Sequence, residues 1–270
     1  MAEAMATLGV WRHLVGARIR ADWQYRTSFF LFLLSQTVIA CLDLAVVAVI
    51  FSQVDTLAGW SGIEVALLFG ISGVAFGLAD ITISQVETAS RHIKAGSFDL
   101  FLLRPLSALV HLSATEFALR RLGRVLQPMV VLIGALLLAP IDWNVERAAL
   151  VVVSVLSGTL IFGSVWVVTS SISFWTVESQ EVANAFTYGG GLATTYPIDL
   201  LGTWLRRILT YLLPLAFVAY LPAARLLGRH QPLGLPGVVA WATPLVALAS
   251  VLVARAVWTL AIRHHRSTGS

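Results

Sequence analysis

Long apolar runs constrain this chain more than any other feature of its sequence. A helix needs about 20 apolar residues to cross a lipid bilayer, because each residue adds only about 1.5 Å to its length. Six segments of the 270-residue chain meet or approach this requirement. They are Ser28–Phe51, Ile63–Val86, Val125–Ala139 with its upstream extension, Ala148–Trp175, Val182–Leu201 and Val238–Ile262. The sequence therefore predicts an all-α, polytopic membrane protein with six transmembrane helices.

The composition supports a single transmembrane domain over residues 1–270. Only 12% of the residues are charged, whereas soluble domains carry about 25%. Residues 84–124 form the longest stretch without a strong apolar run, and this stretch is too short for a separate catalytic domain. The net charge of +4 gives no reason to expect a nucleic-acid partner, because basic residues in a membrane protein chiefly mark its cytoplasmic loops.

Lys and Arg residues are concentrated in alternate connections between the runs. They lie near the N-terminus, between the second and third runs, and in the C-terminal tail, while residues 52–62 contain none. The positive-inside rule then places both termini and the second loop in the cytoplasm, as an even number of spans requires.

The segment Thr203–Gly228 is apolar but is interrupted by Pro214 and Pro222. As a seventh span it would place the basic tail outside the cell. We therefore favour two short re-entrant helices that enter the outer leaflet before the last span, although this topology leaves four arginines on the outer side.

Residues 8–24 have apolar side chains at helical spacing, including Leu8, Trp11, Val15 and Ile19. This pattern, flanked by basic residues, favours an N-terminal interfacial helix that lies along the membrane surface. The alternative is that the segment is the frayed beginning of the first span.

Motifs for catalysis or metal binding are missing from the sequence. It contains no phosphate-binding GxxxxGK[ST] loop and no HExxH pair, and no histidine lies in the middle of a predicted span. The sequence Gly70–Gly73 could be compared with an intramembrane serine-protease motif, but Ser72 then needs a histidine at its depth. We expect these glycines, with Gly77, to allow close helix packing, and we predict no enzyme activity and no cofactor bound by this chain.

Three charged residues lie within apolar runs, where an unpaired charge is costly: Asp43, Asp80 and Arg255. Asp80 and Arg255 have similar predicted depths and could form a pair, either as a structural contact or as part of a substrate path. Asp43 has no obvious partner, so it could be protonated, paired across a dimer, or exposed to a cavity.

The fifth run contains Gly189, Gly190 and Gly191, and then Tyr196 and Pro197. Three glycines and a proline make a poor helix, and broken membrane helices are tolerated where they meet protein or water. This run could form one wall of a translocation path, or it could simply be loosened near the outer face.

The sequence GSFDLFLLRPL, residues 96–106, is unexpectedly apolar for a loop between spans. Gly96 can end the preceding helix, Ser97 or Asp99 can cap a new one, and Pro105 can stop it after about two turns. Such a helix would present Phe98, Phe101 and Leu102 on one face. It could fold into the lipid headgroups, or dock into a groove on a soluble partner.

This segment resembles the cytoplasmic coupling helix of type-two ABC exporter permeases, especially a bacterial subfamily whose loop reads G-x-F-D-x-x-L-L-R-P. A second patch is also similar, namely Tyr196-Pro197 followed by LPLAFVAYLPA at Leu213–Ala223. The surface helix, the six spans and the short helices before the last span are typical of the same family. The resemblance extends over nearly the whole chain.

The resemblance implies a multi-pass permease subunit in a bacterial cell membrane. Two permeases, more often different than identical, would pair above two ATP-binding subunits that hold ATP and Mg. The ATPase-coupling residues would be Gly96, Phe98, Asp99, Phe101, Leu102, Arg104 and Pro105. The expected function is export of an amphipathic or lipid-like compound, taken from the membrane along a path shaped by the first, second and fifth spans.

A secondary active transporter without an ATPase is the alternative. Such a transporter usually has paired discontinuous helices in two repeated halves and a site for a coupling ion. The sequence shows one broken span and no internal repeat.

Overall fold

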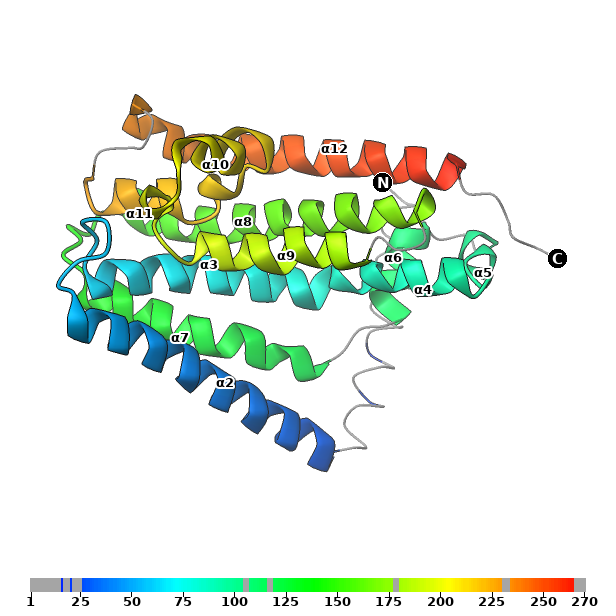
Figure 1. Ribbon diagram of the computed structural model, residues 1–270, viewed down its shortest axis with the longest axis horizontal. Helices are drawn as coiled ribbons and strands as arrows, with labels where there is room; N and C mark the ends of the chain where they lie inside the picture. Colours follow the sequence, from blue (N-terminus) through cyan, green and yellow to red (C-terminus); the bar gives the residue numbers. More distant parts are fainter. Residues whose placement is uncertain are drawn as a thin grey trace.

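The described part of the computed structural model consists of helices joined by short connections (Figure 1). It comprises Gly16, Arg20 and residues 26–103, 107–115, 119–176, 180–229 and 234–264. The longer helices are α2 (Arg26–Gln53), α3 (Gly62–Thr82), α7 (Gly123–Leu138), α8 (Val145–Ser171), α9 (Gln180–Thr194) and α12 (Thr243–His264). The all-α prediction is confirmed for these residues. The predicted interfacial helix at residues 8–24 lies outside them, except for Gly16 and Arg20.

Three of the described helical stretches are long and apolar enough to cross a membrane. They are Gly62–Thr82, Val145–Phe174 and Gly237–His264, and a bent pair at 203–226 makes a fourth if it counts as one span. Helix α7 is apolar but shorter, with 16 residues. The structure thus identifies an integral membrane protein, while the count of six spans stays a prediction.

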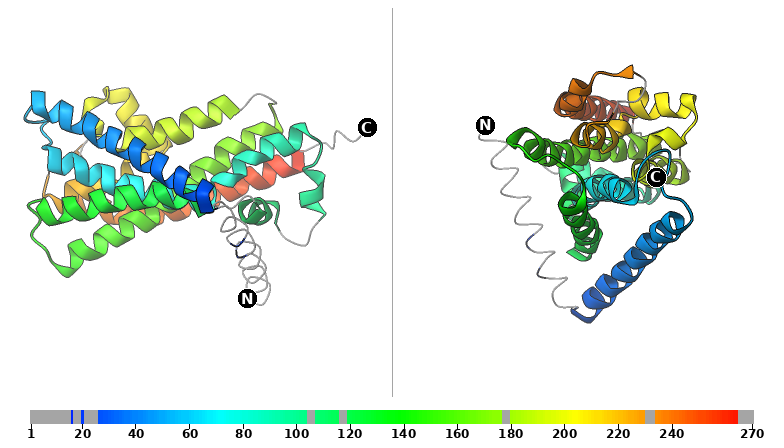
Figure 2. Two further views of the ribbon diagram at one scale, coloured as in Figure 1. Left: turned by 90° about the horizontal axis from the view of Figure 1, so that it is seen from below. Right: turned by 90° about the vertical axis from the view of Figure 1, so that its left-hand side faces the viewer.

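Helix α3 lies at the centre of the bundle, with α7 on one side and α8 and α9 on the other (Figure 1). Its side chains Leu67, Leu68 and Ile71 are fully buried. Helix α2 diverges from this core, as the right-hand view of Figure 2 shows. Large apolar side chains of α2, among them Phe30, Leu34 and Leu42, are accordingly exposed on the isolated chain.

The contact between α3 and α7 depends on three glycines. A Cβ atom added to Gly70 would lie 2.6 Å from the Cα atom of Leu132, and one added to Gly73 would lie 2.5 Å from the Cβ atom of Pro128. At Gly77 the added atom would lie 2.5 Å from the carbonyl oxygen of Arg124. These separations are too short for any side chain. The expectation that the glycines serve close helix packing is therefore confirmed.

The segment after α9 forms the expected short, bent helices. Helix α10 (Thr203–Arg207) continues as a π-turn (η5, Ile208–Leu212) and is followed by a 3-10 turn (η6, Leu215–Phe217) and α11 (Tyr220–Leu226). The two arms, 203–212 and 215–226, meet at an angle of 78° around Pro214. We call 203–226 the α10–α11 hairpin. Most of α11 is buried against the bundle, so the hairpin is part of the fold.

Ion pairs formed by arginines stabilise the end of the molecule that contains α11, which we call the α11 end. Arg206 lies 3.7 Å from Asp199, Arg225 lies 3.0 Å from Glu146, and Arg229 lies 2.6 Å from Glu64. Arg229 also donates a hydrogen bond to the carbonyl of Gly59 and packs over the ring of Trp60. Each of these three arginines therefore has a carboxylate partner. Arg225 and Arg229 tie the segments around the hairpin to the beginnings of α8 and α3, whereas Arg206 holds α10 to the preceding turn η4 (Ile198–Leu200).

We predict that Gly73→Ala destabilises the protein, because its methyl group would overlap Pro128. Overpacking of this kind costs about 1–3 kcal/mol. Thermal unfolding of the purified protein in detergent measures the change. Gly134→Ala in α7 is the matched control: an added Cβ there meets no atom within 4 Å, so its unfolding temperature should be unchanged or higher. Equal unfolding temperatures for Gly73→Ala and the wild type would contradict the packing model.

Candidate functional site

The segment singled out by its sequence lies at the opposite end of the bundle from the α10–α11 hairpin (Figure 1). Helix α4 (Ala89–Lys94) ends there, and Gly96 has a φ of 65°, a left-handed value that favours glycine. The carbonyl of His92 accepts hydrogen bonds from the backbone amides of Ser97 and Phe98. The prediction that Gly96 ends the preceding helix is confirmed.

The next helix, α5 (Asp99–Leu102), has a single turn. The expected length of two turns is wrong, and so is the expected capping residue: Phe98 occupies the N-cap position, without a side-chain capping bond. Leu103 still closes the turn, because its backbone amide donates to the carbonyl of Asp99 at 3.1 Å. Arg104 and Pro105 lie outside the described residues.

The two phenylalanines of this segment face the protein's own interior. Phe98 is 0% exposed and Phe101 is 7% exposed. The ring of Phe98 packs edge-on against Phe174 at 5.1 Å, and the ring of Phe101 lies 4.8 Å from that of His111. Residues three apart share one side of a helical turn, and burial of two phenyl rings against α6 (Ala108–Thr115) and the end of α8 is favourable.

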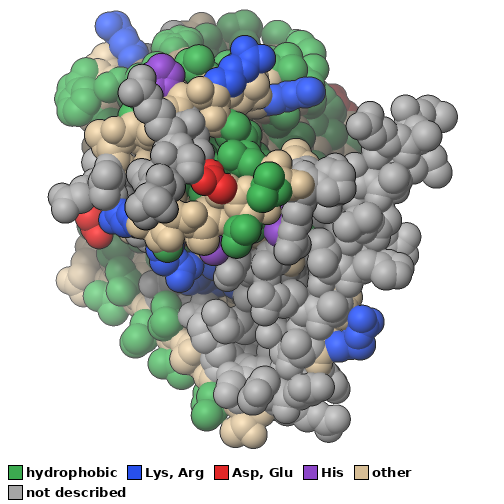
Figure 3. All heavy atoms as spheres, turned by 90° about the vertical axis from the view of Figure 1, so that its right-hand side faces the viewer, with side chains coloured by type: hydrophobic (Ala, Val, Ile, Leu, Met, Phe, Trp, Pro, Cys, Tyr) green, Lys and Arg blue, Asp and Glu red, His purple; other side chains and the backbone are tan. Residues whose placement is uncertain are grey.

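The expectation that Phe98 and Phe101 are presented outward is therefore wrong. The outward side chains are instead Leu100, Leu102 and Leu103, which are 62%, 41% and 81% exposed. Only Leu102 was among the expected contact residues. A signal for Leu100 and Leu103 was present in the sequence. A one-turn helix must attach to the bundle through one side, and if Phe98 and Phe101 form that side, these two leucines lie on the other. Figure 3 views this end: on the part of its surface that is described, hydrophobic side chains lie among basic and acidic ones.

A buried charge cluster lies close to the same end. Asp80 of α3 is fully buried, and its two carboxylate oxygens lie 2.8 Å from Arg121 Nη1 and 3.0 Å from Arg124 Nη1. Arg121 also donates to the hydroxyl of Ser84 and to the carbonyl of Asp80. The two arginines come from η2 (Leu119–Leu122) and the first turn of α7. We call Asp80, Arg121 and Arg124 the Asp80 cluster.

The predicted pair between Asp80 and Arg255 is wrong. The true partners of Asp80 were not recognised from the sequence, because Arg121 and Arg124 precede a span and resemble a solvated basic face. The signal was present, since their spacing of three puts both guanidinium groups on one helix side at the depth where α3 ends. Arg255 instead borders a groove beside α12.

A second acidic side chain extends the polar region. Glu87, in the turn η1 (Ser84–Thr88) that follows α3, accepts a hydrogen bond from the indole nitrogen of Trp166 in α8. Burial raises the pKa of the Glu87 carboxyl, and the bond from Trp166 opposes this shift. The Asp80 cluster and this bond thus link α3, α7 and α8 at one level of the bundle.

The sequence suggested that α9 breaks at its glycines, but the helix is continuous there. It continues through Gly189, Gly190 and Gly191 to Thr194, and the chain leaves the helix only before Pro197, which is buried. A Cβ atom on Gly190 would lie 2.9 Å from Leu215, and one on Gly191 would lie 2.8 Å from Phe76, whereas Gly189 has open space. Close packing against the hairpin and α3 explains two of the three glycines.

A cavity of about 240 Å³ lies between α2, α3 and α9. Gly191 and Tyr196, two of the residues expected along a path, line it. Ser72 also lines it, and its hydroxyl is hydrogen-bonded to that of Thr194 at 2.5 Å, with no histidine in the lining. Asp43 lies on α2, but the structure does not describe its side chain.

A larger groove of about 860 Å³ runs between α8 and α12 and reaches residues 96–103, which contain α5 and which we call the α5 segment. Its lining is mostly apolar and includes Arg255 and Arg263 of α12. Among the described residues no group of histidine, cysteine, aspartate and glutamate could hold a metal ion.

We predict that Asp80→Asn strongly destabilises the protein, since it leaves two guanidinium groups facing each other beside a buried amide. Loss of one partner of a buried ion pair costs about 3–5 kcal/mol. Asp142→Asn is the matched control, because Asp142 is fully exposed where it pairs with Arg147 at 3.4 Å, and exposed pairs contribute about 1 kcal/mol at most. Denaturant unfolding in detergent compares the two, and similar small losses would contradict the role of the Asp80 cluster.

Comparison with known proteins places these features in a family. The family model described as ABC-2 family transporter protein matches residues 37–269, which include α3, the Asp80 cluster, the α5 segment and the hairpin. Searches of curated proteins and of solved structures give no match. Permeases of this family are generally the membrane subunits of transporters and work with ATPase subunits. The chain therefore belongs to the ABC-2 family of transporter proteins.

Proposed function

We propose that this chain is the membrane-spanning permease subunit of an ATP-driven exporter, and that a separate ATP-binding subunit docks on the α5 segment. The observation that carries the proposal is the group of exposed leucines, Leu100, Leu102 and Leu103, on a turn whose other side is fixed by buried aromatic rings. Apolar side chains held in this way are suited to contact a partner. ATP and Mg would be bound by the partner, and this chain would contribute no catalytic group.

The contacts of α5 offer a route from the partner to the membrane helices. Phe98 packs on Phe174, the last residue of the turn η3 (Ile172–Phe174) that follows α8. Phe101 packs on His92 of α4, which continues from α3 through η1. The Asp80 cluster then joins α3 to α7. A displacement of α5 would therefore act on three helices together, as expected when a soluble two-state subunit biases a membrane domain.

We propose the topology that the sequence indicated. Helices α2, α3, α7, α8, α9 and α12 would be the six membrane segments, and the α10–α11 hairpin would be re-entrant. The end of the bundle that contains α4 and α5, which we call the α5 end, would be cytoplasmic, with Arg91, Lys94 and both termini. The support is the concentration of lysine and arginine in these segments.

The exported compound would follow the cavity between α2, α3 and α9. Apolar side chains such as Val46 and Phe69 line this cavity beside the hydroxyls of Ser72 and Tyr196. This mixture suits an amphipathic or lipid-like substrate. A second permease subunit would cover the exposed face of α2 and complete the path. The family resemblance favours a subunit of different sequence over a second copy of this chain.

We predict that Leu103→Asp lowers the amount of ATPase subunit that co-purifies with the permease and reduces ATP-dependent transport in vesicles. A carboxylate at the centre of an apolar contact typically weakens binding by at least 2 kcal/mol, or about 30-fold. The fold should be unaffected, because Leu103 is exposed.

Leu200→Asp is the matched control, since Leu200 is also exposed but lies near the α11 end. It should co-purify with the ATPase as the wild type does. Undiminished ATPase binding by Leu103→Asp would contradict the docking site. Transport that continues without ATP or an ATPase subunit would instead support a secondary active transporter.

A further inference from the structure

The groove between α8 and α12 has the shape of a ligand site and is not used by the proposed path. Its volume of about 860 Å³ is within the usual range for small-molecule sites. Leu160 and Val167 of α8 form one apolar wall, and Trp258 and Ile262 of α12 form another. Phe101 and Leu102 reach it from the α5 segment.

Two arginines in this groove differ from most others in the described part of the chain. Arg121, Arg124, Arg147, Arg206, Arg225 and Arg229 all lie beside carboxylates. Arg255 and Arg263 are exposed on α12 and border the mostly apolar groove, and in the described part of the chain neither forms an ion pair with a carboxylate. Arg255 lies within an apolar run of α12, where an uncompensated cation is costly. These two arginines therefore lack the counter-charge that those six arginines have.

The lining also indicates which charge a ligand should carry. Both arginines are on α12, eight residues or about 12 Å apart along the helix axis. No aspartate or glutamate lines the groove among the residues that the structure describes. The groove thus offers two guanidinium groups to an anion and no carboxylate to an ammonium group. Basic pockets between membrane helices bind anionic lipid headgroups.

We infer that the groove binds an anionic phospholipid, with its phosphate at Arg255 or Arg263 and its acyl chains along the walls formed by α8 and α12. The guanidinium groups donate charge-assisted hydrogen bonds to the phosphate oxygens. The acyl chains cover apolar side chains such as Leu160 and Val167. The lipid comes from the leaflet around the protein, so no soluble partner is required.

The position of the groove gives this lipid a further consequence. Phe101 is buried against the bundle while Leu102 is partly exposed, and both border the groove. A bound lipid therefore contacts the α5 segment and restrains it. This restraint would modulate coupling to an ATPase only if the proposed function is correct. The lipid binding itself does not depend on the proposed function.

Native mass spectrometry of the full-length chain, purified in detergent, tests the inference. The probes are phosphatidylglycerol, which is anionic, and phosphatidylcholine, which is zwitterionic. The wild type should retain phosphatidylglycerol preferentially. Arg255→Gln and Arg263→Gln should each weaken this retention roughly fivefold, and the double variant roughly 30-fold. Leu160→Trp, at a half-exposed position of the groove wall, should weaken it by obstructing the acyl chains.

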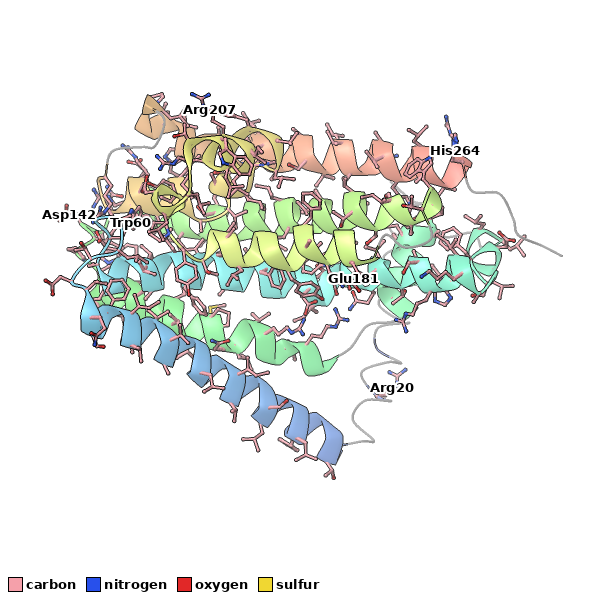
Figure 4. All side chains as sticks on the ribbon, viewed as in Figure 1. Arg20, Trp60, Asp142, Glu181, Arg207 and His264 are labelled. Carbon is pink, nitrogen blue, oxygen red and sulfur yellow. The ribbon has the colours of Figure 1, made fainter. Side chains whose placement is uncertain are left out.

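Arg207→Gln is the matched control, because it removes the same charge from an exposed position on the other half of the molecule (Figure 4). It should bind phosphatidylglycerol as the wild type does. Equal retention of the two lipids, unchanged retention by the double variant, or an equal loss in Arg207→Gln would each overturn the inference. Displacement of the lipid by millimolar inorganic phosphate would also overturn it, since the groove would then recognise a free anion. None of these results depends on an ATPase, so they are independent of the test of the proposed function.

Discussion

The close contact between α3 and α7 is the constraint on which the rest of the structure depends. Glycines of α3 allow the two backbones to approach closely. Near the end of this contact the carboxylate of Asp80 forms ion pairs with two arginines. The charges require the close approach, since a wider separation would leave Asp80 buried without a partner. The close approach in turn requires glycine, because even a methyl group would overlap the facing helix. Packing and electrostatics therefore fix the same geometry.

The two ends of the bundle are held by different interactions. At the α11 end, surface arginines reach across to carboxylates on neighbouring elements, and such partly exposed pairs orient segments more than they stabilise them. At the α5 end, the buried rings of Phe98 and Phe101 and the partly buried ring of Phe174 form the attachment. An apolar attachment of this kind leaves the outward surface of α5 available to a partner, as docking would require.

The sequence allowed prediction of the helical class, the bent hairpin, the termination at Gly96 and the packing role of the glycines. Each of these depends on a local property, such as an apolar run, a proline or a missing Cβ atom. The partners of Asp80 and the direction of Phe98 could not be obtained in this way, because they depend on how separate helices are rotated against one another. Equal predicted depth suggested Arg255, but depth along the membrane does not determine which faces meet. Similarly, the glycines of α9 suggested a break because their neighbours, Phe76 and Leu215, were not known to pack against them.

The burial of the two phenylalanines changes what the recognisable motif encodes. Its aromatic positions are set by the chain's own interior, so they record how α5 is anchored and carry little information about the partner proposed to bind there. The outward leucines are under a looser requirement, since other aliphatic side chains would supply similar apolar area. If the proposed docking role holds, permeases with the same motif are free to change the outward face of α5, and with it their ATPase partner, without any alteration to the bundle.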